Sequence, residues 1–180
     1  MRNVTIGTFN ATAKSSVDSS FIGGRFTGAY LVGLGGNLYA KPQLDVAVTH
    51  LERDGYTETG TGGIALTVAG ANDTIASVSP SVEVGTELSI AGVGVARPFI
   101  RGGATWVDND KFTTSASFAG APPTIAPFTI ASSIDKVVAD VAAGVDLLAT
   151  DGMVLRLEYD GRFGEDTRQH GGAAKLSVPF

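Results

Sequence analysis

Eleven residues decide the fold class: Met153-Val154-Leu155-Arg156-Leu157-Glu158-Tyr159-Asp160-Gly161-Arg162-Phe163. Every second position from Met153 onward is apolar, aromatic or glycine, and four of the intervening positions are charged. Successive side chains of a β-strand point to opposite faces. The segment therefore predicts a strand with one apolar face and one charged face.

The same period of two recurs along the chain. From Ala76 to Leu88, Thr86 is the only even-numbered position that is not apolar, and the odd-numbered positions are serine, glutamate or glycine. The alternation predicts eight strands, near residues 2–13, 21–34, 38–51, 75–88, 94–107, 134–148, 152–163 and 170–180. Most of these segments exceed the about 9–11 residues with which a tilted strand crosses a bilayer.

The connections alternate between short and long. Short turn signals fall at 35–37, 89–93 and 149–152, whereas the stretches 14–20, 52–74 and 108–133 are long and polar. Short turns at one end and long loops at the other are typical of an outer-membrane barrel. We therefore expect an all-β, antiparallel, up-and-down transmembrane β-barrel in a single domain over residues 1–180. Ile64, Leu66 and Val68 alternate inside the longest loop, and we interpret them as a strand extension or a small hairpin above the membrane.

Composition narrows the function. The 180 residues carry 13 Lys and Arg against 18 Asp and Glu, a net charge of −5. A nucleic-acid binder usually has a basic surplus, so we expect no nucleic-acid partner. Cysteine is absent, which excludes disulfides, thiol nucleophiles and Cys-ligated zinc.

Motifs for catalysis and cofactors are weak. Asp108-Asn109-Asp110 offers oxygen ligands for calcium but lacks the glycine and the distal glutamate of an EF-hand loop. The glycine-rich stretches 33–36 and 60–63 precede no predicted helix that could present its N-terminus to a phosphate. A G-x-S-x-G nucleophile elbow is also missing. We expect no enzymatic activity, no cofactor and no metal site.

A soluble β-sandwich would show the same alternation, with its charged face in water. Three features favour a membrane barrel instead. Charge is confined to one face over many consecutive strands, and the chain ends on an aromatic residue. Aromatic residues also gather near strand ends, as in interfacial girdles; they are Tyr30, Tyr39, Trp106, Tyr159, Phe163 and Phe180.

The charged faces are predicted to line the barrel lumen. The candidate residues are Glu83, Arg97, Arg101, Asp140, Asp146, Arg156, Glu158, Asp160 and Arg162. Both signs occur close together, which favours a cross-strand ion network that fills the lumen and fixes the register. The alternative is an acid–base catalytic set. His50 is expected as an interfacial polar tip, and His170 as a solvent-exposed residue at a loop edge.

The N-terminal residues 1–6 lack the continuous apolar segment and the cleavage site of a signal peptide. Taken with the barrel pattern, this predicts that any export signal lay upstream in a longer protein.

The end of the chain carries a resemblance. Lys175-Leu176-Ser177-Val178-Pro179-Phe180 resembles the last strand of bacterial outer-membrane barrels, which commonly ends in phenylalanine. Further stretches resemble the β-barrel translocator domain of autotransporters (type V secretion), over most of residues 21–180. These stretches are 39–46 running into 54–58, 79–85, 97–100, 118–122 and 155–163.

The resemblance implies more than the residues alone do. The family barrel has twelve strands, a helix through the lumen and a secreted passenger upstream, so the eight strands expected here would be the last eight of an N-terminally truncated piece. It implies a bacterial outer-membrane location, contact with outer-membrane lipid, and an anchoring role that supports export of the passenger. It also implies recognition by the barrel-assembly machinery through Leu176, Val178 and Phe180. A standalone eight-stranded structural or adhesive barrel and a soluble all-β binding module are the alternatives.

Overall fold

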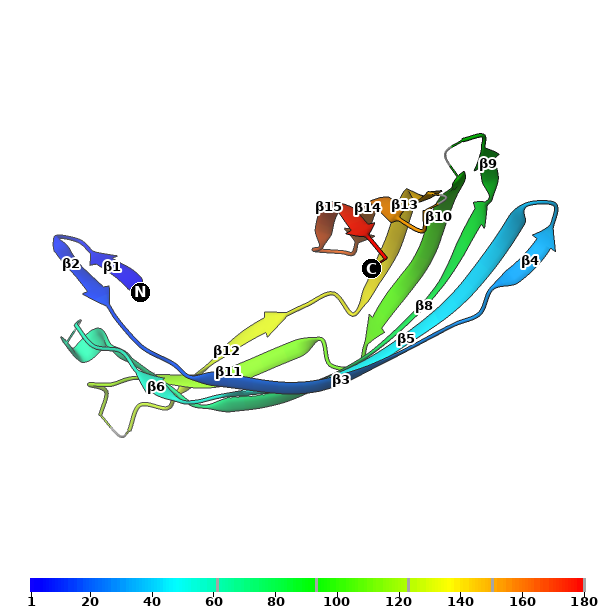
Figure 1. The fold of residues 1–180 in the computed structure, drawn as a ribbon. Helices are drawn as coiled ribbons and strands as arrows, with labels where there is room; N and C mark the ends of the chain where they lie inside the picture. Colours follow the sequence, from blue (N-terminus) through cyan, green and yellow to red (C-terminus); the bar gives the residue numbers. More distant parts are fainter. Residues whose placement is uncertain (61, 93, 123, 150, 180) are drawn as a thin grey trace. The chain divides into compact units, whose positions relative to one another are not determined.

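The computed structural model describes residues 1–60, 62–92, 94–122, 124–149 and 151–179 (Figure 1). They form strands and one 3₁₀ helix, η1 (Gly62–Ile64). The strands of the first half are β1 (Arg2–Ile6), β2 (Phe9–Ala13), β3 (Ser19–Ala29), β4 (Val32–Gly35), β5 (Leu38–Arg53), β6 (Tyr56–Thr57), β7 (Leu66–Val68) and β8 (Ala71–Thr86). Those of the second half are β9 (Leu88–Ile90), β10 (Gly94–Val107), β11 (Lys111–Phe118), β12 (Phe128–Ser133), β13 (Val137–Ala149), β14 (Val154–Phe163) and β15 (Arg168–Ser177).

The chain divides into two compact units, which are described separately. The first comprises residues 1–24, 48–75 and 109–134, and the second comprises 25–47, 76–108 and 135–180. Strands β3, β5 and β8 contribute residues to both units. Within the described ranges, no helix has the length and apolar character to span a membrane.

The second unit is built on one continuous sheet. Its strand order is β15-β14-β13-β10-β8-β5-β3, with β4 paired to β5 and β9 paired to β10. Neighbouring strands lie side by side in Figure 1, and the registers of β10 with β13 and of β13 with β14 are antiparallel throughout. An antiparallel order of this kind confirms the all-β class and the largely sequential connection of the predicted strands.

Glycines shape the short turns of this unit. Gly35 and Gly36 have φ angles of +96° and +59°, and Gly152 has a φ of +87°. Such left-handed conformations strain any residue with a Cβ. The turns at 36–37 and 151–153 therefore fall where the sequence placed its short turn signals.

The first unit has a small core of its own. Its buried apolar side chains are Ala13, Ala65, Val68 and Ala116. Its sheet has the order β12-β11-β7-β6. The β1–β2 hairpin is tied to it by Arg2, whose guanidinium donates to both carboxylate oxygens of the buried Glu58, and by a bridge between Lys14 and Thr59.

The prediction of one continuous strand near residues 2–13 is wrong. Residues 2–13 form a hairpin in which Arg2 lies opposite Ala13 and Ile6 opposite Phe9. The chain reverses after Ile6 because Gly7 adopts a φ of +58°. This leaves seven strands, not eight, in the main sheet order.

Other boundaries also differ. The predicted strand 21–34 is divided into β3 and β4, and the stretch 108–133, expected as a loop, contains the β11–β12 hairpin. The interpretation of Leu66 and Val68 as part of a small hairpin is confirmed, since β7 pairs with β6 and with β11. Ile64 falls in η1.

Candidate functional site: a charged face opposite an apolar face

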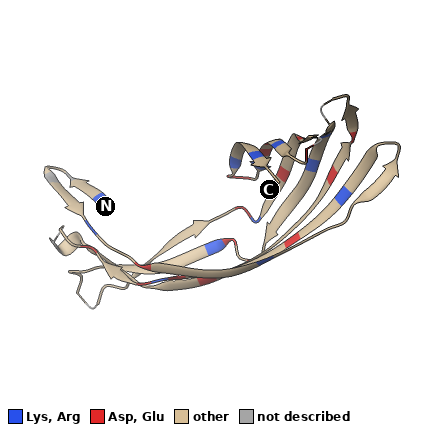
Figure 2. Ribbon diagram, in the orientation of Figure 1, with Lys and Arg blue, Asp and Glu red and all other residues tan. Residues whose placement is uncertain are grey.

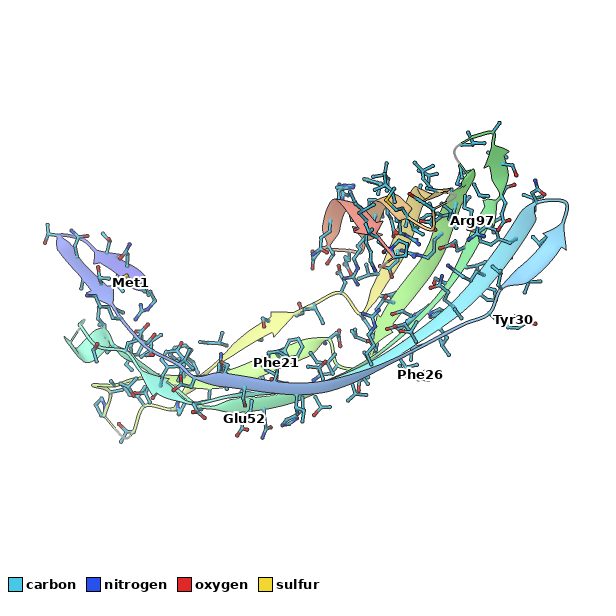
Figure 3. All side chains as sticks on the ribbon, in the orientation of Figure 1. Met1, Phe21, Phe26, Tyr30, Glu52 and Arg97 are labelled. Carbon is cyan, nitrogen blue, oxygen red and sulfur yellow. The ribbon has the colours of Figure 1, made fainter. Side chains whose placement is uncertain are left out.

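The apolar face of the second unit is the exposed one. Along β8, β10, β13 and β14, alternate large side chains are 39% to 66% exposed: Val78, Val82, Val84, Ile100, Trp106, Val137, Val141, Leu157, Tyr159 and Phe163. Figure 3 shows Phe26 and Tyr30 on the face of the sheet opposite to Arg97. On the other face Glu83 is only 2% exposed and Phe99 is 4% exposed. This distribution is the reverse of that in a soluble protein and fits a sheet whose apolar face meets lipid.

The charged side chains face one another across the strands. Arg101 lies opposite Glu83, and Asp146 has Arg97 on one neighbouring strand and Arg156 on the other. Figure 2 shows acidic and basic residues interspersed along these strands. Opposite charges in directly facing positions stabilise an antiparallel pairing, so these residues favour a single register.

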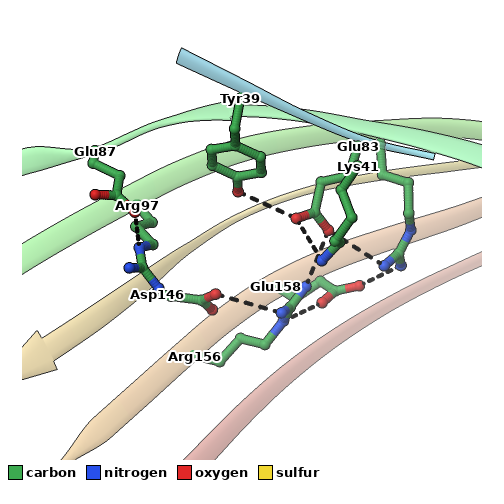
Figure 4. A network of polar contacts seen from close by, with 9 residues as sticks. Tyr39, Lys41, Glu83, Glu87, Arg97, Asp146, Arg156 and Glu158 are labelled. Atoms are coloured by element: carbon green, nitrogen blue, oxygen red, sulfur yellow. Dashed lines mark hydrogen bonds and ion pairs between the residues drawn. The ribbon is translucent and has the colours of Figure 1, made fainter. Parts of the chain in front are cut away.

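Six charged side chains of this face and one tyrosine meet in one group, which we call the charge cluster (Figure 4). Its members are Tyr39, Lys41, Glu83, Arg101, Asp146, Arg156 and Glu158. Glu83 is its centre. Its Oε1 lies 2.8 Å from Nζ of Lys41 and accepts a hydrogen bond of 3.2 Å from the Tyr39 hydroxyl. Its Oε2 lies 3.9 Å from a guanidinium nitrogen of Arg101 and 3.7 Å from one of Arg156.

Glu158 completes the other side of the charge cluster. Arg101 donates to its Oε1 and Arg156 to its Oε2, both at 2.7 Å. Arg156 also donates to Asp146 at 3.5 Å, and its guanidinium carbon lies 4.4 Å from the centre of the Phe99 ring. Three carboxylates thus meet three cations, so the cluster carries no formal net charge.

The charge cluster reaches across several strands. Glu83 is on β8 and Arg156 is on β14, and β10 and β13 lie between them. Three strand spacings amount to about 14 Å in a flat sheet, yet the two side chains meet at 3.7 Å. Long side chains on a concave face account for this contact. The charged face is therefore the inner face of a curved sheet.

The remaining predicted charges form smaller groups. Asp140 accepts from Arg162 at 2.9 Å and from the Thr105 hydroxyl at 2.7 Å. Nε of Arg97 lies 2.7 Å from Oε1 of Glu87, in a geometry that does not meet hydrogen-bond alignment. For Asp160, no cationic group lies within 4 Å among the residues that the structure describes. The assignment of all nine charges to a barrel lumen stays a prediction.

An open polar trough of about 540 Å³ runs along this face. Asp45, which accepts from Arg25 and Thr27, lines it from one side, and Asp140 and Arg162 line it from the other. Serine and threonine residues also line it, together with Ala47, Pro80, Val141 and glycines. Asp45 and Asp140 each accept from a guanidinium and a hydroxyl group, and Glu158 accepts from two guanidinium groups.

Two aromatic side chains of the inner face rest on glycines. A Cβ on Gly85 would lie 2.5 Å from the Tyr39 hydroxyl, and a Cβ on Gly144 would lie 2.8 Å from the Phe99 ring and 2.4 Å from the carbonyl oxygen of Leu157. Real Cβ contacts do not approach so closely. Because these two glycines have no side chain, the rings of Tyr39 and Phe99 can pack directly over them.

Gly144→Ala is expected to destabilise the folded state by about 1–3 kcal/mol, because the methyl group meets main chain as well as Phe99. Gly102→Ala serves as the control, since nothing lies within 4 Å of its Cβ position. Urea titration of the lipid-inserted protein measures both. Equal stabilities of the two variants would contradict this account.

Asp135 organises the connection between β14 and β15. Its carboxylate accepts from the amides of Asp166 at 2.9 Å and Thr167 at 2.7 Å. A Cβ on Gly164 would lie 2.1 Å from the same carboxylate, so a larger residue there would displace the Asp135 side chain. Hydrogen bonds from the Thr167 side chain and from the Asp166 main chain lower the pKa of Asp135 below its ordinary value of 3.8.

The lowered pKa of Asp135 makes the stability of this loop depend on pH. A lowered folded-state pKa means that the ionised carboxylate stabilises the loop at neutral pH, and that this contribution is lost as the pH falls through the folded-state pKa. We expect the amide resonances of Asp166 and Thr167 to hold their positions at pH 5 and to shift below about pH 4. In Asp135→Asn the part of the shift that comes from Asp135 should be lost, so the Thr167 amide should move less than in the wild type. An equal shift of the Thr167 amide in both proteins would assign the titration to another group.

Sequence reasoning missed several members of this face. The sequence predicts Tyr39 in an aromatic girdle, although its hydroxyl contacts Glu83. The predicted lumen set does not contain Lys41 and Glu87, although they pair with Glu83 and Arg97. Their position in the period of two was a usable signal, because Lys41 occupies a polar position of its strand.

The predicted assembly signal is described only in part. Leu176 is 63% exposed near the end of β15, and Val178 is 55% exposed just beyond it. Phe180 lies outside the described residues. The two described positions share the side of the strand that carries the exposed apolar residues.

One comparison with known proteins gives a match. The family model described as "Autotransporter beta-domain" matches residues 1–160, well over half of the chain. The matched range includes the β1–β2 hairpin, which lies outside the residues 21–180 of the resemblance, and ends within β14. No curated protein matches the chain.

Proposed function

Because the chain belongs to the autotransporter β-domain family, we propose that it anchors a translocator in the membrane and supports export of an upstream passenger. The family consists of outer-membrane β-barrels of Gram-negative bacteria, so the chain is an outer-membrane protein. The soluble all-β alternative does not fit this location. The number of strands in the complete barrel and the passenger itself belong to the proposal.

One observation supports this role above the others. The sheet exposes its apolar face, while its charged face holds a neutral charge cluster and a polar trough. A hydrated inner face with balanced charge offers few strong binding sites, so an extended polypeptide would pass without being held by a surplus of either sign. We also propose that the role involves no catalysis.

A reporter passenger tests export. An epitope-tagged segment placed upstream of Met1, behind an export signal, should reach the cell surface of a Gram-negative host and be removed by external protease. The matched control carries Leu157→Arg, which should impair membrane insertion and lower the amount of tag at the surface. A tag that remains protected while the barrel is inserted would contradict export and favour the standalone structural or adhesive barrel.

We further propose the barrel-assembly machinery as a partner. Before insertion the last strand has an unpaired edge, which can add to a partner sheet through main-chain hydrogen bonds while alternate side chains set specificity. Leu176, Val178 and Phe180 supply those side chains. Deletion of Phe180 should impair insertion in cells more than folding in detergent, and equal insertion with and without it would contradict the assembly signal.

A further inference from the structure

Four side chains gather on the apolar face where β14 ends and β15 begins: Tyr159, Phe163, Arg168 and His170. We call them the rim cluster. Arg168 lies directly opposite Phe163, and His170 lies opposite Gly161. The Tyr159 hydroxyl and Nδ1 of His170 are 2.7 Å apart. The His170 ring meets Phe163 edge-on at 5.4 Å and stacks on Tyr159 at 6.1 Å.

The register places the rim cluster on the lipid side. Leu157, Tyr159 and Phe163 are alternate residues of one strand and are all exposed on the apolar face. Their partners on β15 share this face, because directly opposite residues of an antiparallel pair point the same way. Lys175 lies opposite Arg156 and so belongs to the charged face.

Along the strand direction, the rim cluster lies at the height of an aromatic girdle. Phe163 lies opposite Ala139, and Trp106 lies opposite Val137, two residues before Ala139 on β13. The long connections, which include residues 108–136, leave the sheet at this end. In outer-membrane barrels the long connections are extracellular and aromatic girdles mark the headgroup region. The rim cluster therefore faces the outer leaflet at headgroup depth.

The Arg168 guanidinium of the rim cluster is available for binding. Among the described residues, no carboxylate lies within 4 Å of the Arg168 guanidinium. The carboxylate of Asp135, in a neighbouring loop, is occupied by the amides of Asp166 and Thr167. The Tyr159 contact occupies Nδ1 of His170 and leaves Nε2 as a second hydrogen-bonding nitrogen. Beside them, the position of a Cβ on Gly172 is open space.

We propose that the rim cluster binds the phosphate headgroup of an anionic lipid in the outer leaflet. Arginine presents paired N–H groups that match phosphate oxygens, and its guanidinium is more weakly hydrated than an ammonium group. Tyr159 and Phe163 contact the headgroup region through their rings, and His170 adds a hydrogen-bonding nitrogen on the same face of β15 as Arg168. This site depends on the membrane location of the chain and does not depend on passenger export.

Native mass spectrometry of the full chain, folded in detergent with phosphatidylglycerol and phosphatidylcholine at equal concentration, tests the site. We expect wild-type protein to retain phosphatidylglycerol preferentially, and Arg168→Gln to retain about fivefold less of it. Lys175→Gln removes the same charge from the other face of the same strand and should behave as wild type. Phosphatidylcholine retention should be equal in all three proteins.

Two outcomes would overturn the proposal. If Lys175→Gln loses as much phosphatidylglycerol as Arg168→Gln, the preference reflects overall charge and not the rim cluster. If millimolar inorganic phosphate displaces the lipid fully, the site binds free phosphate. Should Arg168→Gln fail to show the heat-modifiable mobility of a folded barrel, Arg168→Lys replaces it. That variant keeps the charge and loses the paired donors, so it should retain an intermediate amount, and a wild-type amount would contradict the guanidinium contact.

Discussion

Glu83→Gln should destabilise the folded sheet by about 3–5 kcal/mol, the cost of removing one partner from a buried ion pair. Glu83 is 2% exposed and contacts Lys41, Arg101 and Arg156. Without its carboxylate, three cations share two carboxylates on a buried face. Urea titration of the lipid-inserted protein measures the loss.

Two controls separate this effect from a general loss of charge. The Glu87 side chain is 46% exposed and pairs only with Arg97 among the described residues. Glu87→Gln should therefore cost less than about 1 kcal/mol, as for exposed ion pairs. The double variant Glu83→Gln, Lys41→Gln restores the balance of charge and should recover part of the stability. A double variant as unstable as the sum of the single variants would contradict the charge cluster.

Leu157→Arg is expected to cost about 2–4 kcal/mol at the bilayer midplane, because it places a charge on the lipid-facing side. Asp160→Asn changes a carboxylate on the other face of the same strand, which has no cationic group within 4 Å among the described residues, so it leaves the charge cluster intact and should cost less. Heat-modifiable electrophoretic mobility after folding into vesicles compares the two. Equal behaviour of the variants would contradict the assignment of the faces.

The alternation of apolar and polar residues accounts for most of the strands that the sequence predicts correctly. The segment around Met153 predicted a strand over 152–163, and β14 covers Val154–Phe163. The charged face also followed from the sequence, since every one of its residues occupies an alternating position. The contacts between these residues could not be predicted from the sequence. The contact between Glu83 and Arg156, for example, depends on the curvature of the sheet and on the registers of four strands.

Two elements were not predicted because their sequence signals are weak. The hairpin at Gly7 lies within an apparently continuous alternation, and its Gly-Thr pair is not a strong turn signal. In β11, Phe112, Thr114, Ala116 and Phe118 alternate with polar residues, but half of the apparent apolar side is small or polar. A weak pattern in a polar stretch favours a loop, and only the pairing with β7 and β12 stabilises it as a strand.

The central claim is that the apolar face of this sheet contacts lipid and the charged face does not. Because the chain contains no cysteine, a nitroxide spin label can be placed at single cysteines at each position from 155 to 163. In lipid vesicles, collision with oxygen should peak at 155, 157, 159, 161 and 163, and collision with a water-soluble nickel chelate should peak at 156, 158, 160 and 162. The opposite phase, or no alternation, would contradict the account.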